Sequence, residues 1–164
     1  MERRIVQVFY GPGKGKTSAA VGQCIREASL GQRVTMIQFL KGKDAEEFNY
    51  LDKLEPDIRL FRFEKSDESY DSLLESQKKE EKQNIRNGMN FARKVIDTGE
   101  CDVLVLDEVL GLLDIGILTI QDIYRLIEHC GNEVSLLMTG KYVPKELLQH
   151  IDIVSEIVLI KNMA

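Results

Sequence analysis

The sequence predicts an α/β protein in which a mostly parallel sheet carries helices on both faces, giving three layers. Short apolar runs of strand length alternate along the chain with longer segments that repeat apolar residues at helical spacing. The most apolar run, Val103 to Leu106, contains no polar residue, which is typical of a strand buried on both faces of a parallel sheet.

The first elements form a strand, a glycine-rich loop, a helix and a second strand. Ile5 to Phe9 is the first apolar run, and Gly11 to Thr17 is the loop. Apolar residues then recur at helical spacing as far as Gly31, and Val34 to Phe39 is the next apolar run. Because crossovers between parallel strands are right-handed, this unit predicts that the first two strands are parallel neighbours in the sheet.

The rest of the chain continues the alternation without a linker or an internal repeat, so we expect one domain over residues 1–164. In the middle of the chain we expect a short helix over 44–54, a strand over 58–63 and a long helix over 72–98, whose charged first half is a solvated face. A strand over 103–106 follows, and then a helix that runs from a capping box at Thr119 and Asp122 to Gly131. The last expected elements are a strand over 134–138, a short helix with Pro144 at its first position, and a strand over 157–160.

Composition narrows the classes of partner. The 22 Lys and Arg residues are outnumbered by 27 Asp and Glu, a net charge of −5, which gives no general attraction for nucleic acid or an anionic membrane. The 3 cysteines form no C-x-x-C pair, and no stretch is apolar enough to span a bilayer. Met1 is followed almost at once by the first predicted strand, so no signal peptide is expected. We expect a cytoplasmic protein with reduced thiols.

The glycine-rich loop predicts a phosphate site. A strand, this loop and a helix supply unpaired backbone N–H groups and the positive end of a helix dipole. Lys16 adds a positive charge, and the Thr17 hydroxyl is placed to bind Mg²⁺. Gly11 to Gly15 enclose one residue fewer than the usual motif, so either the loop is shortened or Tyr10 takes the first glycine position. The fold predicted is of the P-loop NTPase type (RecA-like); the alternative is a glycine-rich turn without a ligand.

Two acids, Asp107 and Glu108, directly follow the most apolar strand. This order delivers carboxylates to the edge of a parallel sheet beside the phosphate loop, so one of them would complete a magnesium shell with Thr17. Alone, two acids after a strand are equally typical of a helix N-cap. His129 and His150 are interpreted as structural or surface residues, and no nucleophile–base constellation is apparent. The chemistry should therefore need little proton transfer.

Five blocks of sequence carry a resemblance to a known family. They are Val8–Ala20, Gln38–Gly42, Leu106–Glu108 with Leu113–Gly116, Thr139–Lys141, and Asp152–Glu156. In this order and over nearly the whole chain, they resemble the ATP:corrinoid adenosyltransferases of cobalamin biosynthesis and salvage. The most specific blocks are the shortened phosphate loop and the Gln-Phe-x-Lys-Gly strand end.

The resemblance implies transfer of the 5′-deoxyadenosyl group of ATP to the cobalt(I) of a reduced corrinoid, cob(I)alamin or cob(I)yrinic acid a,c-diamide, with tripolyphosphate leaving. It implies a homodimer, Mg²⁺ and a flavoprotein electron donor. It assigns catalysis to Lys16, Thr17 and Glu108 and the metal to Thr17 and Glu108. The expected nucleotide contacts are Gly11, Gly13, Lys14, Gly15, Lys16, Thr17, Ser18, Arg26, Gln38, Lys41 and Lys141.

The chain departs from the family pattern in three ways. It has no Trp, and only Phe61 and Phe63 fall in the region of the family's aromatic stretch, where they are equally typical of core strand residues. Lys141 stands where the family has arginine, and the chain ends at Ala164, where family members usually continue. Two alternatives therefore stand beside the transferase: a P-loop NTPase or phosphotransferase, with Glu108 orienting a water or acceptor, and a nucleotide-binding module without corrinoid turnover.

Overall fold

The computed structural model describes residues 3–40 and 46–164 and contains one six-stranded sheet flanked by helices. The strands are β1 (Val6–Tyr10), β2 (Val34–Gln38), β3 (Ile58–Arg62), β4 (Val103–Asp107), β5 (Ser135–Gly140) and β6 (Ile153–Glu156). The α-helices are α1 (Lys16–Ser29), α2 (Glu46–Leu51), α3 (Glu75–Asp97), α4 (Gly111–Asp114), α5 (Ile120–His129) and α6 (Lys145–Leu148). Short 3₁₀ turns occupy Asp52–Leu54 and Tyr70–Ser72.

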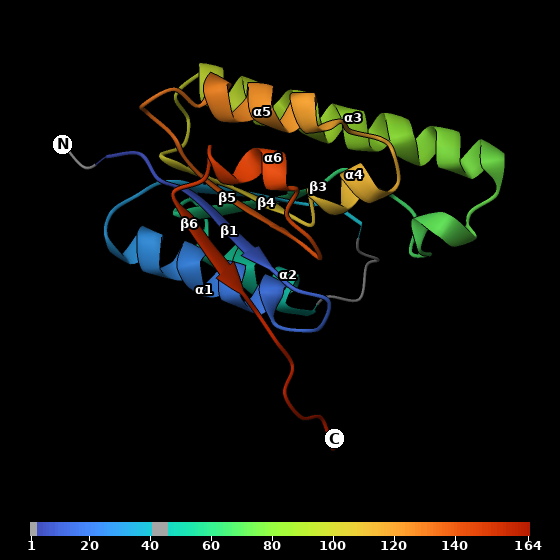
Figure 1. The fold of residues 1–164 in the computed structure, drawn as a ribbon. Helices are drawn as coiled ribbons and strands as arrows, with labels where there is room; N and C mark the ends of the chain where they lie inside the picture. Colours follow the sequence, from blue (N-terminus) through green and yellow to red (C-terminus); the bar gives the residue numbers. More distant parts are fainter. Residues whose placement is uncertain (1–2, 41–45) are drawn as a thin grey trace.

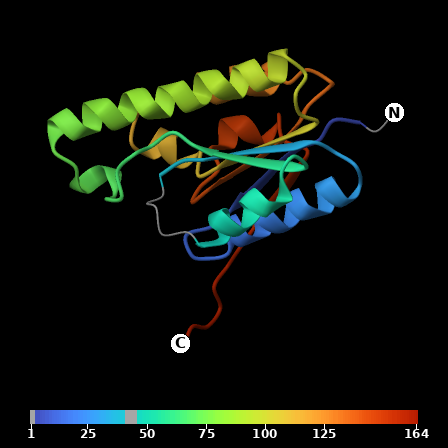
Figure 2. The same ribbon diagram turned by 180° about the vertical axis from the view of Figure 1, so that it is seen from behind.

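The predicted three layers are confirmed. Every pairing of neighbouring strands in the described chain is parallel. Helices α1 and α2 cover one face of the sheet, and α3, α4, α5 and α6 cover the other (Figures 1 and 2). None of the helices in the described ranges combines the length and apolar character needed to cross a bilayer.

The predicted adjacency of β1 and β2 is wrong. The strand order is β3-β2-β4-β5-β1-β6, so β4 and β5 lie between them. The crossover rule fixes the handedness and the parallel direction of a connection, but it does not require the two strands to touch. β4 is buried at every residue, so it takes a central position, with neighbours at both edges and helices over both faces.

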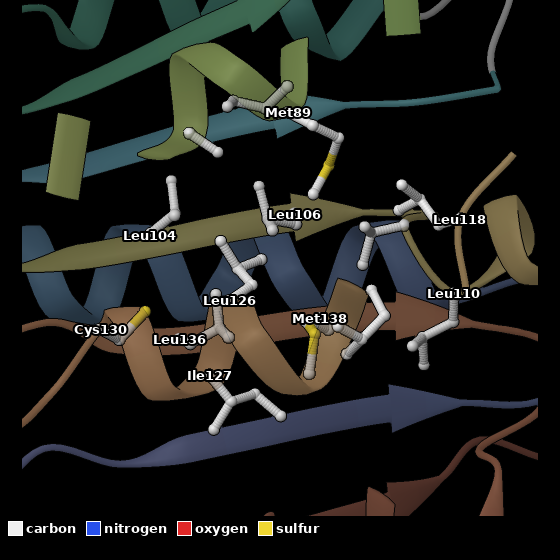
Figure 3. Close-up of a cluster of buried hydrophobic side chains, with 14 of the residues drawn as sticks. Met89, Leu104, Leu106, Leu110, Leu118, Leu126, Ile127, Cys130, Leu136 and Met138 are labelled. Carbon is white, nitrogen blue, oxygen red and sulfur yellow. The ribbon is translucent and has the colours of Figure 1, made fainter. Parts of the chain in front are cut away.

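Two apolar clusters hold the layers together. The larger joins the sheet to α3 and α5, and Figure 3 shows Leu106 and Leu136 of the sheet close to Met89 of α3 and Leu126 of α5. The smaller lies between the sheet and α1 and consists of Ala20, Cys24, Val34, Met36, Ile58, Val103, Val105 and Leu137. Alternate residues of a strand supply opposite faces, so each buried strand contributes to both clusters.

The long helix α3 is solvated over most of its charged first half, as predicted, and this half extends beyond the sheet (Figures 1 and 2). Glu81 is the exception, because it is 4% exposed. Its carboxylate accepts from the backbone N–H of Lys65 at 3.0 Å and from Nδ2 of Asn84 at 2.9 Å. Two donors offset part of the cost of burying this charge.

The capping box of α5 is confirmed, whereas the position of Pro144 is corrected. Thr119 Oγ1 accepts from the N–H of Asp122 at 3.2 Å, and the Asp122 carboxylate accepts from the N–H of Thr119 at 2.8 Å. The bond from the backbone N–H of Thr119 lowers the pKa of the Asp122 carboxyl. Pro144 is the N-cap of α6 and has extended backbone, so the first helical residue is Lys145.

The last strand lies at 153–156, not at the predicted 157–160. β6 pairs with β1, and their register ends with Tyr10 opposite Glu156. After that pair the N–H of Ile157 still donates to the carbonyl of Tyr10 at 2.7 Å. In the part of the chain that the structure describes, no strand pairs with the later apolar residues Leu159 and Ile160, which are 53% and 88% exposed. The apolar run over 157–160 therefore has the composition of a strand but is not paired as one in the described sheet.

Gly140 offers a test of the packing between β5 and the segment before α4. A Cβ at Gly140 would lie 2.4 Å from Cβ of Leu110. We expect Gly140→Ala to lower the free energy of unfolding by about 1–3 kcal/mol, measured by urea denaturation. The control is Gly22→Ala at an exposed position of α1, where a Cβ would meet nothing within 4 Å. This control should raise the free energy of unfolding by about 0.5–1 kcal/mol. Equal stability of Gly140→Ala and the wild type would contradict the packing described.

Candidate nucleotide-binding site

The loop between β1 and α1 curls around the side chain of Lys16. Lys16 is the first residue of α1 and is 6% exposed. Its Nζ donates to the carbonyl oxygen of Gly11 at 2.8 Å and to that of Gly13 at 2.9 Å. Tyr10 is the last residue of β1, so the loop begins at Gly11. The structure thus favours the shortened loop over the alternative in which Tyr10 takes the first glycine position.

A cavity of about 440 Å³ opens beside this loop. Its lining consists of Pro12, Gly13, Lys14, Gly15, Lys16, Thr17, Ser18 and Glu108. The N-cap of α1 is Gly15, so within the described chain this position supplies no side-chain cap to the helix. The first N–H groups of the helix and the positive end of its dipole therefore remain for a ligand. This arrangement suits an anion with several phosphate groups.

Gly11 is needed because another segment approaches it closely. A Cβ at this position would lie 2.1 Å from the carbonyl oxygen of Ile157. The backbone of Gly11 also has φ +153°, at the edge of the region that favours glycine. The sequence assigns Gly11 to the nucleotide, but in the structure its missing side chain makes room for the segment after β6. Its carbonyl contributes to the site by holding Lys16.

A row of polar side chains ends the face of the sheet under α1. The row consists of Arg62 of β3, Gln38 of β2, Asp107 of β4 and Thr139 of β5. Each follows, along its strand, apolar residues of the cluster beneath α1. The register pairs Gln38 with Arg62 on one side and with Asp107 on the other. Parallel strands thus bring four distant residues to one edge, next to the phosphate loop.

Asp107 is the centre of this row and is fully buried. Its carboxylate accepts from Thr17 Oγ1 at 3.0 and 3.2 Å, from Gln38 Nε2 at 2.9 Å and from Thr139 Oγ1 at 2.7 Å. A buried carboxylate without partners is strongly destabilising, whereas charge-assisted bonds from three side chains compensate its lost hydration. The bond from Thr17 also fixes the start of α1 against the end of β4.

Glu108, the residue after Asp107, lines the cavity beside the loop. Its backbone adopts the left-handed conformation, with φ +60°, and its N–H donates to Thr139 Oγ1 at 2.7 Å. The side chain is 16% exposed and lies 3.8 Å from Nζ of Lys16. The two neighbouring acids therefore have different surroundings: Asp107 lies against Thr17, and Glu108 lies against Lys16.

A second cavity, of about 370 Å³, also has Glu108 in its wall. The other lining residues are Leu40, Ser69, Tyr70, Asp71, Gly111, Asp114, Ile115 and Lys141. Sequence reasoning missed Ser69, Tyr70 and Asp71, because a short 3₁₀ turn carries no periodic pattern. Glu108 thus borders both a phosphate-type cavity and a second, mixed polar and apolar one.

The similarity of this chain to a known family extends over almost its whole length. Residues 2–164 match the family described as ATP:corrinoid adenosyltransferase BtuR/CobO/CobP. The chain belongs to this family. This adenosyltransferase is 26% identical over 161 residues to the corrinoid adenosyltransferase of Escherichia coli (strain K12), covering 98% of this chain and 80% of that protein. It is also 26% identical over 166 residues to corrinoid adenosyltransferase CobA of Salmonella typhimurium, with 98% and 80% covered.

A solved structure supports the fold of the adenosyltransferase. The KaiC-like protein PH0186 from Pyrococcus horikoshii OT3 aligns with a TM-score of 0.52 and 16% sequence identity, covering 85% of this chain and 61% of that chain. At this identity the likeness concerns the fold alone. It agrees with the P-loop type of sheet predicted from the strand, loop and helix order.

Some of the other residues expected to contact the nucleotide line the two cavities, and Arg26 does not. Lys14 and Ser18 line the cavity beside the loop, and Lys141 lines the second cavity. Arg26 lies in the last turn of α1, about 15 Å along the helix axis from the loop, and is not brought to either cavity. Lys41 lies outside the described residues.

Phe61 and Phe63 are partly buried and pack against the larger apolar cluster of the adenosyltransferase. Their ring centroids lie 4.6 and 5.4 Å from that of Phe91 in α3. A Cβ at Gly88 would come within 3.1 Å of the Phe63 ring, so the absent side chain lets α3 approach β3. The structure therefore supports the core interpretation of these two aromatic residues.

Glu64 is a partly buried carboxyl beside the strand end that carries Gln38. It accepts from the N–H of Leu40 at 2.7 Å, and Leu40 has an unusual positive φ of 59°. Burial raises the pKa of Glu64 from 4.5 to about 7, and the charge of Glu81 adds to this rise. The bond from Leu40 and the charge of Arg62 act in the opposite direction. Ionised Glu64 is thus less well accommodated than neutral Glu64.

The raised pKa predicts a pH-dependent stability. Because the folded-state pKa of about 7 exceeds the ordinary value of 4.5, the contribution of Glu64 is fully present below about pH 4.5 and is lost as the pH rises through about 7. Glu64→Gln keeps an acceptor for Leu40 without the charge. The free energy of unfolding of this variant minus that of the wild type should be about 1–3 kcal/mol larger at pH 8 than at pH 4.5. Urea denaturation of both proteins at the two pH values measures it.

The matched control is Glu68→Gln, which changes an exposed carboxyl of the same segment. Its difference from the wild type should be the same at both pH values. A Glu64→Gln difference that is likewise constant across pH would contradict the raised pKa.

Proposed function

We propose that this adenosyltransferase transfers the 5′-deoxyadenosyl group of ATP to the cobalt(I) of a reduced corrinoid and releases tripolyphosphate. The observation that carries the proposal is the meeting of two cavities at Glu108. One of them has the uncapped helix end and the buried lysine that a triphosphate requires. The other would receive the acceptor next to the nucleotide.

The reaction asks little proton chemistry of the protein. Cobalt(I) is a nucleophile that carries no proton, so it needs no general base. A bond forms between cobalt and carbon 5′ as the bond from carbon 5′ to the triphosphate oxygen breaks, and the electron pair leaves with tripolyphosphate. The residues must align the two substrates and stabilise the leaving group. A flavoprotein donor, a homodimeric state and a cytoplasmic location are parts of the same proposal, drawn from the family resemblance.

Within this proposal the loop serves the leaving group. The backbone N–H groups of Gly13 to Ser18 bind phosphate oxygens, and Lys16 neutralises charge that develops on the tripolyphosphate. Glu108, at 3.8 Å from Nζ of Lys16, holds this lysine on the cavity side. Lys141 places a further positive charge at the second cavity.

The oxygen groups beside the loop fit Mg²⁺. In the described part of the chain, no three His, Cys, Asp or Glu side chains gather as a metal cluster. Magnesium bound with ATP needs few protein ligands, because phosphate oxygens and waters complete its shell. The Thr17 hydroxyl and the carboxylates of Asp107 and Glu108 would hold it, and Thr17 Oγ1 already lies 3.0 Å from the Asp107 carboxylate. When bound, the ion would offset negative charge on the departing triphosphate.

The deciding experiment mixes the protein with MgATP and chemically reduced cobalamin under anaerobic conditions. The corrinoid spectrum and the phosphate product are followed together. Adenosylcobalamin with tripolyphosphate, formed only when both substrates are present, is the expected result. ADP formed without corrinoid would instead indicate a P-loop NTPase, and intact bound ATP with no product would indicate a nucleotide-binding module.

Lys16→Ala tests the phosphate site itself. Removing a charged donor should weaken ATP binding about ten- to a hundredfold, measured by calorimetric titration with MgATP. The control is Lys79→Ala, an exposed lysine of α3 on the opposite face of the sheet, which should leave affinity unchanged. Thermal unfolding of both variants checks that the loop change has not unfolded the protein. Unchanged affinity of a folded Lys16→Ala protein would contradict the assigned site.

A further inference from the structure

Arg62, Gln38 and Asp107 form a chain of hydrogen bonds across three neighbouring strands. Arg62 Nε donates to Gln38 Oε1 at 2.8 Å, and Gln38 Nε2 donates to Asp107 Oδ2 at 2.9 Å. The three residues are register partners, and each is the last residue of its strand. The chain therefore runs straight across the edge of the sheet toward the phosphate loop.

The chemistry of its two ends fixes the direction of this chain. A guanidinium group has only N–H donors, and an ionised carboxylate has only acceptors. The amide of Gln38 has one group of each kind, so it satisfies both neighbours in a single orientation. We propose that Arg62 is a positioning residue of the nucleotide site, which holds the Gln38 amide in the orientation that donates to Asp107.

The effect reaches the site through Asp107. That carboxylate also accepts from Thr17, and both residues are among the proposed magnesium ligands, so the inference rests on the proposed function. Arg62 does not line the cavity beside the loop, and β2 separates β3 from β4. Arg62 therefore acts on the metal ligands through Gln38.

Without the guanidinium, the Gln38 amide loses the donor to its Oε1 and is oriented by its bond to Asp107 alone. If the amide turns, Oε1 faces the Asp107 oxygen that now lies 2.9 Å from Nε2, and two acceptors repel each other. Among the residues that the structure describes, Asp107 then keeps the donors from Thr17 and Thr139. A carboxylate held by fewer donors is less well fixed for a metal ion. The expected result is weaker use of Mg²⁺, while the loop that binds phosphate is unaltered.

The test is ATP binding as a function of Mg²⁺ concentration, measured by calorimetry without corrinoid. In the wild type, Mg²⁺ should strengthen ATP binding. Arg62→Met should raise the Mg²⁺ concentration needed for half of this effect about three- to tenfold and leave the affinity for metal-free ATP unchanged. Arg62→Lys keeps a group that only donates, so it should recover most of the wild-type value.

Two controls separate positioning from general effects of charge. Arg59→Met removes an arginine from the same strand whose side chain pairs with Glu100 at 3.9 Å, and it should change nothing. Glu64→Gln alters the carboxyl whose pKa Arg62 also lowers, and it should likewise leave the Mg²⁺ requirement unchanged. A shift in Glu64→Gln equal to that in Arg62→Met would overturn the inference, because the effect would then run through Glu64.

A double-mutant cycle decides whether Arg62 acts through Gln38. If it does, adding Arg62→Met to Gln38→Leu should produce no further loss, whereas independent effects would multiply and overturn the inference. A Mg²⁺ dependence in Arg62→Met and Arg62→Lys that matches the wild type would overturn the inference alone. A wild type that binds ATP equally well without Mg²⁺ would remove the proposed metal role and the inference with it.

Discussion

The buried carboxylate of Asp107 is the constraint on which the arrangement of the site depends. A charge with no exposed surface must be surrounded by donors, and here the donors come from α1, β2 and β5. The need to satisfy one carboxylate therefore ties three elements to the end of β4. This bond network also positions the phosphate loop, because Thr17 donates to Asp107 and lines the cavity beside the loop.

The neighbouring acids illustrate how one step along the chain separates two roles. Strand geometry sends Asp107 to the face under α1, and the left-handed backbone at Glu108 ends the strand and turns the next side chain into the cavity. A non-glycine residue in this conformation is held there by its surroundings, here by the bond from its N–H to Thr139. The same Thr139 hydroxyl donates to Asp107. One threonine thus orients both acids.

The parts of the site that sequence could predict are those that lie within a few residues of one another. Lys16 and Thr17 follow from a contiguous motif, and the capping box of α5 follows from residues three positions apart. The bond between Arg62 and Gln38 spans 24 positions of the sequence, and the bond between Gln38 and Asp107 spans 69. Both bonds therefore depend on which strands are neighbours in the sheet. Strand order was the weakest prediction, because an apolar run does not reveal which strands flank it. The prediction of a strand over 157–160 was wrong for the same reason, because an apolar run does not show whether a neighbouring strand pairs with it.

The close approach of Ile157 to Gly11 also bears on how the protein is made. The phosphate loop is synthesised well before the segment that follows β6, yet a side chain on its first glycine would collide with that later segment. β6 completes the edge of β1, and Asp152 bonds to both backbone groups of Val6. Such long-range contacts form late in folding. A nascent chain therefore carries its nucleotide-binding motif before that motif has its final surroundings, so the finished site has to wait for the synthesis of β6 and the segment after it.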